Sequence, residues 1–392
     1  MTAEPVNDPI DAAIRIITGD DEIAKVAMYV DDVEVSWALV KWFDLRFGAS
    51  VIRVGGIGGV ETAAAFRNRG YARRLLDATV RFVERSDAPL LTLFGIPGFY
   101  HRFGFLPLGP DYMLQVRDSA TLPQPDPAHI ARPAQEADLP AIRAIWAGES
   151  PGLTGRVIRA DDQDSWVQLR KSITGGRNDC RVVTDASGAV LGYAWLVQHH
   201  WYMGGFREDG KNNLDIGEAG AISPVGADAV LAMLPAWRDE REARDIVLAL
   251  PPRQHSVGRA SQLCDVTAEA EFHANESYMG RTVGSDDLLR QLVPEFHNRW
   301  QAAAPDWRGT IDFAIGEERT RLQFDDGVSV VDAAGVADCT ITLSPGECAR
   351  LVFGAFDPDD LLWRSGADER TREVGGILFP QGETYIEPAD RF

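Results

Sequence analysis

A short turn early in the chain has the residue types that hold an anion. It reads Arg67-Asn68-Arg69-Gly70-Tyr71-Ala72 and joins the strand end Val60-Glu61-Thr62 to a segment with the apolar spacing of a helix. The first N–H groups of a helix have no partner within the helix, and the helix dipole makes that end positive. The turn therefore suits a pyrophosphate, and the strand end can offer main-chain groups to an extended ligand. An arginine-rich helix start on a solvated surface has the same spacing, so both interpretations stand at this point.

Two other phosphate-binding patterns are absent from the sequence. The paired glycines of GGIGG (55–59) lie inside a predicted strand and do not open a helix, as the G-x-G-x-x-G pattern requires. The chain also has no Walker A loop. A phosphate site would therefore have to be built from the turn and the strand before it.

The elements around the turn alternate between strands and helices. Apolar residues recur at helical spacing after Gly70 and predict a helix that ends near Arg85. A second, shorter helical turn is expected at 98–105. Predicted strands lie at 25–30, 35–47, 50–62, 89–95 and 112–116.

The length and pattern of the chain predict three domains. A chain of 392 residues exceeds what one hydrophobic core usually supports. The proline-rich stretch 118–127 has no periodicity and is typical of a linker, after which a second alternating unit weakly repeats the first. From about residue 284 the order changes to a helix, a run of strands and another helix. We therefore predict an α+β protein with domains at 1–118, 119–283 and 284–392.

Composition and charge argue against several functions. No apolar run approaches the roughly 20 residues that span a bilayer, and the start of the chain has no secretion signal. The formal net charge of −20 argues against nucleic acid as a partner and is compatible with a cationic substrate, or simply with solubility. The four cysteines are scattered, without C-x-x-C or histidine at ligand spacing. We expect a cytoplasmic protein with reduced thiols, no metal site and no membrane partner.

The strand end and the turn together resemble a known cofactor motif. Val60-Glu61-Thr62 followed by Arg67 to Ala72 is similar to the acetyl-CoA motif, R/Q-x-x-G-x-G/A, of the GCN5-related N-acetyltransferase (GNAT) superfamily. The chain resembles one branch of it, the enhanced-intracellular-survival (Eis-like) acetyltransferases, over nearly its whole length. The segments that support this narrower resemblance are GGIGGV (55–60), FYHRFGF (99–105) and the closing TYIEPADRF (384–392). The resemblance implies two tandem acetyltransferase-fold domains followed by a sterol-carrier-like α+β domain.

The resemblance also implies roles for individual residues. Tyr100 matches the family's general acid, and Phe392 matches the terminal residue whose free carboxylate is the general base. The pantetheine arm of acetyl-CoA would pair with Val60, Glu61 and Thr62. The thioester end would be lined by Gly95 and Ile96. The pyrophosphate would be held by Asn68, Arg69, Gly70, Tyr71, Ala72 and Arg73.

These groups suit the transfer of an acetyl group to a primary amine. An alkylammonium with a pKa of about 10.4 is protonated at neutral pH and must lose a proton before it attacks a thioester. A carboxylate accepts that proton, and a phenol assists the departing thiolate. Because an α-carboxylate has an unperturbed pKa of about 3.5, we expect burial among aromatic residues to raise the pKa of the Phe392 carboxylate. The predicted function is an acetyl-CoA-dependent N-acetyltransferase acting on an aminoglycoside, polyamine or lysine-like acceptor, either a small molecule or a peptide.

Three further expectations concern the rest of the chain. The family pattern has a strand and a helix ahead of the element that starts near Asp11, and the sequence has too few residues there for both. Either this part of the acceptor-pocket wall is missing, or the start of the sequence was set too late. The matching stretch of the second unit, GEAGAISPVGADAVLAML (217–234), has no arginine–glycine turn, so we expect no CoA there. The resemblance implies a homo-oligomer, specifically a hexamer.

Two other functions stay open on the residues alone. One is a catalytically lapsed acyl-CoA-binding protein, which a short N-terminal region would favour. The other is a lipid-binding or scaffold protein centred on the third domain. Tyr100 could also be an ordinary core tyrosine, and chain ends are often frayed.

Overall fold

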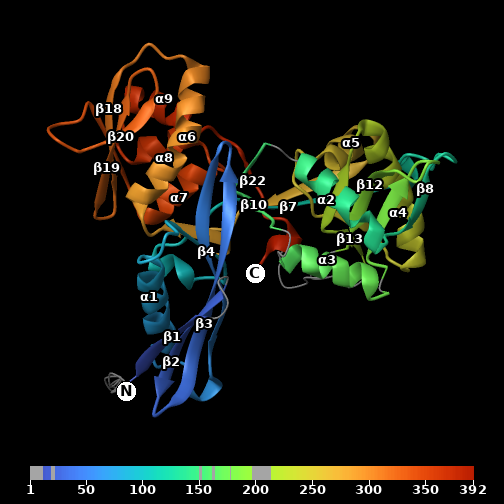
Figure 1. The fold of residues 1–392 in the computed structure, drawn as a ribbon, viewed down its shortest axis with the longest axis horizontal. Helices are drawn as coiled ribbons and strands as arrows, with labels where there is room; N and C mark the ends of the chain where they lie inside the picture. Colours follow the sequence, from blue (N-terminus) through green and yellow to red (C-terminus); the bar gives the residue numbers. More distant parts are fainter. Residues whose placement is uncertain (1–11, 19–22, 150–151, 161–163, 177, 197–212) are drawn as a thin grey trace.

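The chain folds into three units of mixed α+β structure. The structure, a computed structural model, describes residues 12–18, 23–149, 152–160, 164–176, 178–196 and 213–392. Figure 1 shows a first unit built on a long twisted sheet, a second unit beside it, and a C-terminal unit above the sheet. The α+β fold class expected from the sequence is confirmed.

An eight-stranded sheet forms the first unit. Its strand order is β1-β2-β3-β4-β5-β17-β6, with β10 paired to β3. The strands are β1 (Ala13–Thr18), β2 (Ile23–Val30), β3 (Val33–Phe47), β4 (Ser50–Thr62), β5 (Leu90–Gly95), β6 (Leu106–Pro107), β10 (Arg156–Ile158) and β17 (Ser277–Thr282). The helices are α1 (Tyr71–Val83) and the short 3₁₀ turns η1 (Ala64–Phe66) and η2 (Tyr100–Phe103).

Local sequence explains the hairpins and the helix of this unit. Asp31 and Asp32 turn β2 into β3 with φ angles of 48° and 57°, a left-handed conformation that aspartate tolerates. The apolar face of α1 packs Leu75 and Leu76 onto one side of the sheet. The opposite side of the sheet packs against the C-terminal unit. The central strands of the sheet are therefore covered on both faces by different parts of the chain, whereas β1 at the edge is exposed.

The described residues of the second unit form two four-stranded sheets and four α-helices. One sheet has the order β14-β12-β11-β8 and the other β13-β15-β7-β16. The strands are β7 (Asp111–Val116), β8 (Ile130–Pro133), β11 (Cys180–Thr184), β12 (Val190–Trp195), β13 (Leu214–Ile216), β14 (Glu218–Ala221), β15 (Ile246–Leu248) and β16 (Val266–Glu271). The helices are α2 (Leu139–Gly148), α3 (Asp164–Thr174), α4 (Pro224–Glu240) and α5 (His255–Leu263), with 3₁₀ turns η3 (Ser119–Thr121) and η4 (Glu136–Asp138).

The first and second units exchange strands. β7 precedes residue 118 but pairs with β15 and β16 of the second unit. β17 lies before residue 283 but enters the large sheet between β5 and β6. Strand pairing between distant segments leaves no local sequence signal, so the domain ranges predicted from the pattern do not describe this exchange. As sequence ranges, they stay predictions.

A four-stranded sheet and four helices form the C-terminal unit. The sheet order is β20-β19-β18-β21, and aromatic residues such as Phe313 and Phe324 fill its core. The strands are β18 (Gly309–Ile315), β19 (Glu318–Phe324), β20 (Val328–Val331) and β21 (Cys339–Leu343). The helices are α6 (Ser285–Ala303), α7 (Pro345–Phe353), α8 (Pro358–Arg364) and α9 (Glu369–Leu378).

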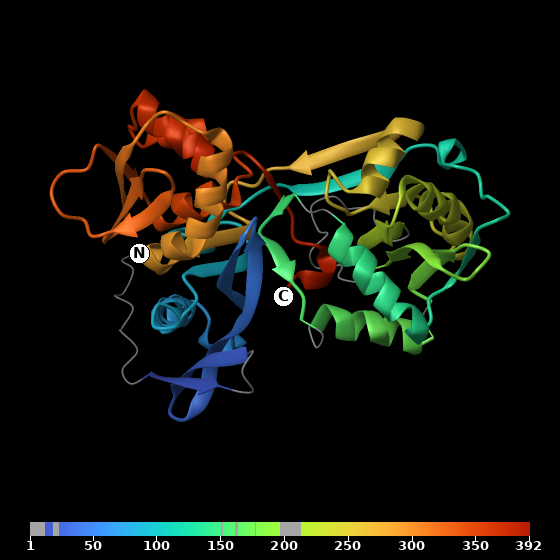
Figure 2. The same ribbon diagram turned by 45° about the horizontal axis from the view of Figure 1, so that its top comes forward.

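The end of the chain returns to the middle of the molecule. After α9, β22 (Glu383–Thr384) pairs in parallel with β9 (Leu153–Thr154), and the short turn η7 (Pro388–Asp390) follows. Figures 1 and 2 both place the C-terminus between the large sheet and the second unit. Among the described residues, no helix combines the length and apolar character that crossing a bilayer requires.

Candidate active site

The parallel strands β4 and β5 separate in the middle of the large sheet. Their pairing ends at Ile57 and Leu93. β4 continues to Thr62 against β3, and β5 continues to Gly95 against β17. The main-chain groups of β4 beyond Ile57 that face β5 are therefore not taken up by that strand. An opening at the carboxyl ends of parallel strands can accept an extended ligand.

The turn after β4 presents main-chain N–H groups at a helix start. Asn68 and Gly70 are both left-handed, with φ angles of 61° and 78°. Within the described residues, α1 has no side-chain cap at Gly70 and no acidic residue in its first turn. A Cβ on Gly70 would meet no atom within 4 Å. The free N–H groups and the positive end of the helix dipole make this a geometry that can hold an anion.

An open pocket lies along the outer side of α1. It has a volume of about 560 Å³ and reaches from Arg73 to η2, β17 and Pro345 of α7. Its charged lining residues are Arg73, Arg81, Arg102, Arg281, Asp77 and Glu84. Arginines outnumber carboxylates here, although the chain as a whole has a net charge of −20. Of these residues, only Arg73 belongs to the turn that the sequence motif marks.

Tyr100 lies at the end of β5, on the α1 side of the sheet. It is 7% exposed and belongs to the same apolar core as Leu93 and Tyr71. Its ring lies 3.3 Å from the point where a Cβ on Gly95 would stand. Burial raises the pKa of Tyr100 to about 12, so the phenol keeps its proton at neutral pH.

Phe392 reaches the large sheet from the opposite side. Its ring packs against Phe43 and Phe94, with centroids 5.2 and 5.7 Å apart. A Cβ on Gly56 would lie 2.6 Å from the Phe392 ring, and one on Gly58 would lie 3.4 Å from the Phe392 carboxyl carbon. The absence of side chains at these two positions lets the ring and the carboxyl group approach β4 closely.

The residues singled out from the sequence therefore lie around one opening. The carboxyl group of Phe392 stands where β4 leaves β5, and Tyr100 stands at the end of β5 on the other face of the sheet. The remaining residues follow β4 and the turn: Val60, Glu61, Thr62, Asn68, Arg69, Gly70, Tyr71, Ala72 and Arg73. Gly95 and the exposed Ile96 lie at the end of β5. Their individual roles stay predictions.

The second unit has a similar strand arrangement, but side chains occupy it. β13 pairs in parallel with β15, and the chain then continues as β14 against β12. Gln254 donates to the carbonyl of Ala219, and Glu149 accepts from the amide of Ala221 at 2.8 Å. The hydroxyl of Tyr385 donates at 2.6 Å to the carbonyl that follows β15. The main-chain groups that a ligand would need are bonded to the protein itself.

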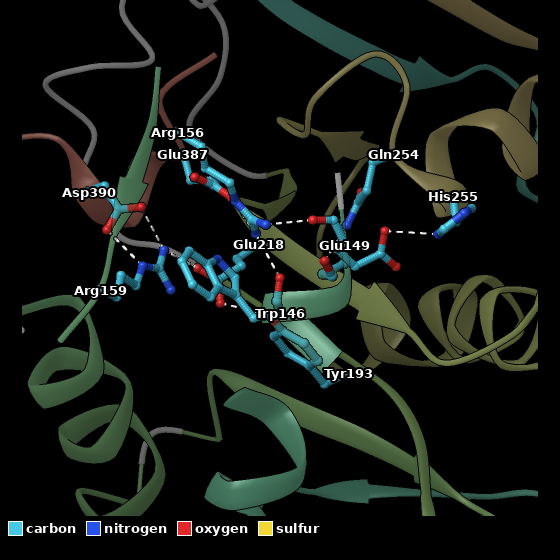
Figure 3. Close-up of polar contacts among 11 residues, drawn as sticks. Trp146, Glu149, Arg156, Arg159, Tyr193, Glu218, Gln254, His255, Glu387 and Asp390 are labelled. Atoms are coloured by element: carbon cyan, nitrogen blue, oxygen red, sulfur yellow. Dashed lines mark hydrogen bonds and ion pairs between the residues drawn. The ribbon is translucent and has the colours of Figure 1, made fainter. Parts of the chain in front are cut away.

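A buried ionic cluster between the second unit and the end of the chain was missed by sequence reasoning (Figure 3). Arg159 pairs with Glu218 and Asp390, and Arg156 pairs with Glu387. The indole ring of Trp146 lies 4.0 Å from the guanidinium group of Arg156 and 4.4 Å from that of Arg159. Because the arginines and the tail lie 231 residues apart in the chain, no local motif could have revealed the pairs.

Two other expectations concern a metal site and the start of the chain. In the part of the chain that the structure describes, no group of three or more histidine, cysteine, aspartate or glutamate residues could hold a metal ion. The segment in which the N-terminal departure from the family pattern was expected, residues 1–11, lies outside the described residues.

Comparisons with known proteins agree with this geometry. The family model of the acetyltransferase (GNAT) domain matches residues 22–108, and no curated protein matches the sequence. A probable N-acyltransferase of unknown function from Enterococcus faecalis superposes with a TM-score of 0.71 at 14% identity, covering 95% of this chain and 90% of that one. A GCN5-related N-acetyltransferase from Kribbella flavida gives a TM-score of 0.66 at 16% identity, covering 94% and 88%. Eis1 from Mycobacterium abscessus gives 0.62 at 13% identity, covering 97% and 100%.

These similarities establish the fold across the units. The tandem acetyltransferase folds expected from the sequence are confirmed, whereas the sterol-carrier likeness of the C-terminal unit stays a prediction. The likeness in sequence is to the GNAT acetyltransferase domain, over residues 22–108 of the chain.

Proposed function

We propose that the chain is an acetyl-CoA-dependent N-acetyltransferase that acts on a primary amine. The observation that carries the proposal is the position of the Phe392 carboxyl carbon, 3.4 Å from the Cβ position of Gly58. That point lies directly beyond the last β4–β5 pair, inside the GNAT domain. A carboxylate there stands beside the opening into which an acyl thioester would extend.

Acetyl-CoA would run along β4 towards the start of α1. Val60 to Thr62 would offer main-chain groups to the pantetheine arm, and Asn68 to Arg73 would hold the pyrophosphate. Gly95 and Ile96 would line the thioester end. The arginines of the open pocket would bind phosphate at the nucleotide end, where Phe99 also offers an aromatic face.

The carboxylate of Phe392 would act as the general base. An acceptor amine is protonated at neutral pH and becomes a nucleophile only when it loses a proton. The carboxylate would take this proton, directly or through one water, as the nitrogen attacks the acyl carbon. A C–N bond then forms, and the C–S bond of the thioester breaks.

Tyr100 would assist the departing thiolate from the other face of the sheet. Its pKa of about 12 keeps the phenol protonated, so its O–H can donate to the sulfur as negative charge develops. Burial in the α1 core restricts the ring, which favours a fixed donor direction.

One acetyl-CoA per chain is proposed. Gln254, Glu149 and Tyr385 occupy the main-chain groups of the second unit that correspond to the opening in the first unit. A ligand would have to break these bonds before it could bind. The second unit would therefore have a structural role.

The acceptor is proposed only as a class. A primary amine of a small molecule or peptide, such as an aminoglycoside, a polyamine or a lysine-like group, suits a carboxylate base. The sterol-carrier likeness of the C-terminal unit and assembly into a homo-oligomer, a hexamer by resemblance, are part of the same proposal.

An acetyl-transfer screen over amines, with free thiol as the readout, tests this function. We expect thiol release from acetyl-CoA that depends on the amine, together with one CoA site per chain in calorimetry. CoA binding without amine-dependent release for any acceptor would instead support an acyl-CoA-binding protein. Lipid recovered by extraction and mass spectrometry, without CoA binding, would support a lipid carrier.

A further inference from the structure

The segment that leads to Phe392 is held by the second unit and by residues in and directly after β10, although it follows the C-terminal unit in the sequence. The hydroxyl of Tyr385 bonds to the main chain after β15. Glu387 pairs with Arg156 at 3.2 Å. Asp390 accepts two hydrogen bonds from Arg159, at 2.8 and 2.9 Å. The chain then ends at the centre of the large sheet, where the Phe392 ring packs against Phe43 and Phe94.

The bond between Arg159 and Asp390 is unusually well enclosed. Both side chains are almost fully buried, with 0% and 1% exposed. The guanidinium group lies beside two indoles that contact each other, 4.4 Å from the Trp146 ring and 4.8 Å from the Trp166 ring. Glu218 binds the same guanidinium group from a third direction at 2.6 Å. Figure 3 shows Arg159 directed at Asp390, at the end of η7.

We infer that Arg159 is a positioning residue, which fixes the Phe392 carboxylate at the β4–β5 opening by holding Asp390. The inference rests on the proposed function of that carboxylate. A planar guanidinium that donates two bonds to one carboxylate fixes direction as well as distance. Asp390 is two residues from Phe392, so its displacement moves the terminal carboxylate with it.

Stability alone does not account for this arrangement. A buried ion pair contributes little net stability, because removing both charges from water offsets their attraction. Arg159 already has Glu218 as a partner. The second carboxylate, from Asp390, adds a link to the end of the chain. The second unit would thus act in catalysis without binding acetyl-CoA.

The test compares the full chain with two variants and a matched control. Asp390→Asn weakens the link and leaves the Arg159–Glu218 pair intact, so the fold should survive. Arg159→Lys keeps the charge but removes the two-pronged geometry. Asp138→Asn is the control, because Arg132 also binds one carboxylate, that of Asp138, with two bonds of 2.7 and 2.9 Å.

The rate at which a carboxypeptidase releases Phe392, monitored by mass spectrometry, measures how firmly the C-terminal segment is bound, independently of catalysis. Cleavage requires the tail to leave its site, so its rate follows the open population. We expect release on the order of tenfold faster in Asp390→Asn and Arg159→Lys, and unchanged in Asp138→Asn. Wild-type release rates in both tail variants, with thermal melting showing that they are folded, would overturn the inference. If Asp390→Asn does not fold, Arg159→Lys gives the same test.

Steady-state kinetics then test whether binding of the C-terminal segment affects the reaction. The two tail variants should lose kcat by on the order of tenfold to a hundredfold, with KM for acetyl-CoA unchanged, because only the base is displaced. Faster release of Phe392 with wild-type kcat would contradict the positioning role. If the wild-type protein acetylates no amine, the proposed function fails, while the release rates still decide whether Arg159 holds the tail.

Discussion

Arg159 and Asp390 form two hydrogen bonds of 2.8 and 2.9 Å across 231 residues of chain. Arg159 directly follows β10 and contacts Glu218, Trp146 and Trp166 of the second unit, and Asp390 lies two residues before Phe392. This pair links the second unit to the opening in the first unit's sheet. It explains how a residue that follows the C-terminal unit comes to lie beside Gly58 of β4.

Gly70→Glu is expected to abolish CoA binding. The new carboxylate would stand at the start of α1, where it would repel the pyrophosphate and occupy the positive end of the helix. Gly188→Glu is the control, because Gly188 is also left-handed, with a φ of 87°, and its Cβ would also meet open space. Calorimetry with CoA should show no binding for the first variant and normal binding for the second. Equal affinities in the two variants would remove the turn from the binding site.

Gly56→Ala is expected to reduce turnover by displacing Phe392. Its Cβ would lie 2.6 Å from the Phe392 ring, so the ring must move, and a shift of about 1 Å at a catalytic group can cost a hundredfold in rate. The matched variant Gly55→Ala would meet Leu91 at 3.1 Å on the other face of the sheet. Both variants should lose about 1–3 kcal/mol of stability in thermal unfolding. Only Gly56→Ala should lose kcat, and an equal loss in both would contradict the placement of Phe392.

Tyr100→Phe is expected to lower kcat by on the order of a hundredfold, since it removes the proton donor and keeps the ring. The affinity for acetyl-CoA should change little. Tyr278→Phe is the control, because Tyr278 is another buried tyrosine, on the face of the large sheet opposite Tyr100, with its ring centroid 5.2 Å from that of Phe94. This variant should retain activity. Unchanged turnover in Tyr100→Phe would make Tyr100 an ordinary core residue.

The pH dependence of the wild-type rate checks the same assignment. A phenol with a pKa of about 12 stays protonated below that pH, whereas a tyrosine with an ordinary pKa would be half ionised at about pH 10. The donor is therefore present throughout the range in which amines lose their protons. We expect no fall in kcat between about pH 8 and pH 10. A fall in that range that disappears in Tyr100→Phe would contradict the raised pKa.

Local features of the sequence predicted the first unit well. The hairpin of β2 and β3, the strand β4 and the helix after Gly70 follow from alternation, turn residues and helical spacing, all of which act over short distances. The end of β4 and the turn after it could be located because their motif is continuous in sequence, whereas the separation of β4 from β5 was not predicted. The glycines at 56 and 58 lie inside a strand, a signal of close approach by another group, but the sequence does not say which group.

Contacts between distant segments could not be predicted in the same way. β17 enters the large sheet, and β7 leaves the first unit, because of pairing partners far along the chain. The Arg159–Asp390 pair has no motif, since each residue alone resembles any surface charge. In the second unit, the carbonyl of Ala219 accepts a hydrogen bond from the side-chain amide of Gln254, 35 residues away. No local pattern in the sequence indicates this bond.

The most direct measurement of the central claim is amine-dependent thiol release by a chain extended by one alanine after Phe392. The extension keeps the Phe392 ring and moves the carboxylate by up to about 3.5 Å, beyond the contact that proton transfer needs. Phe392→Leu is the control, because it keeps a terminal carboxylate at the native position in the chain. The extended protein should bind CoA and unfold like the wild type, yet lose most of its turnover, while Phe392→Leu retains the larger part. Turnover at the wild-type rate in the extended protein would contradict a catalytic role for the terminal carboxylate.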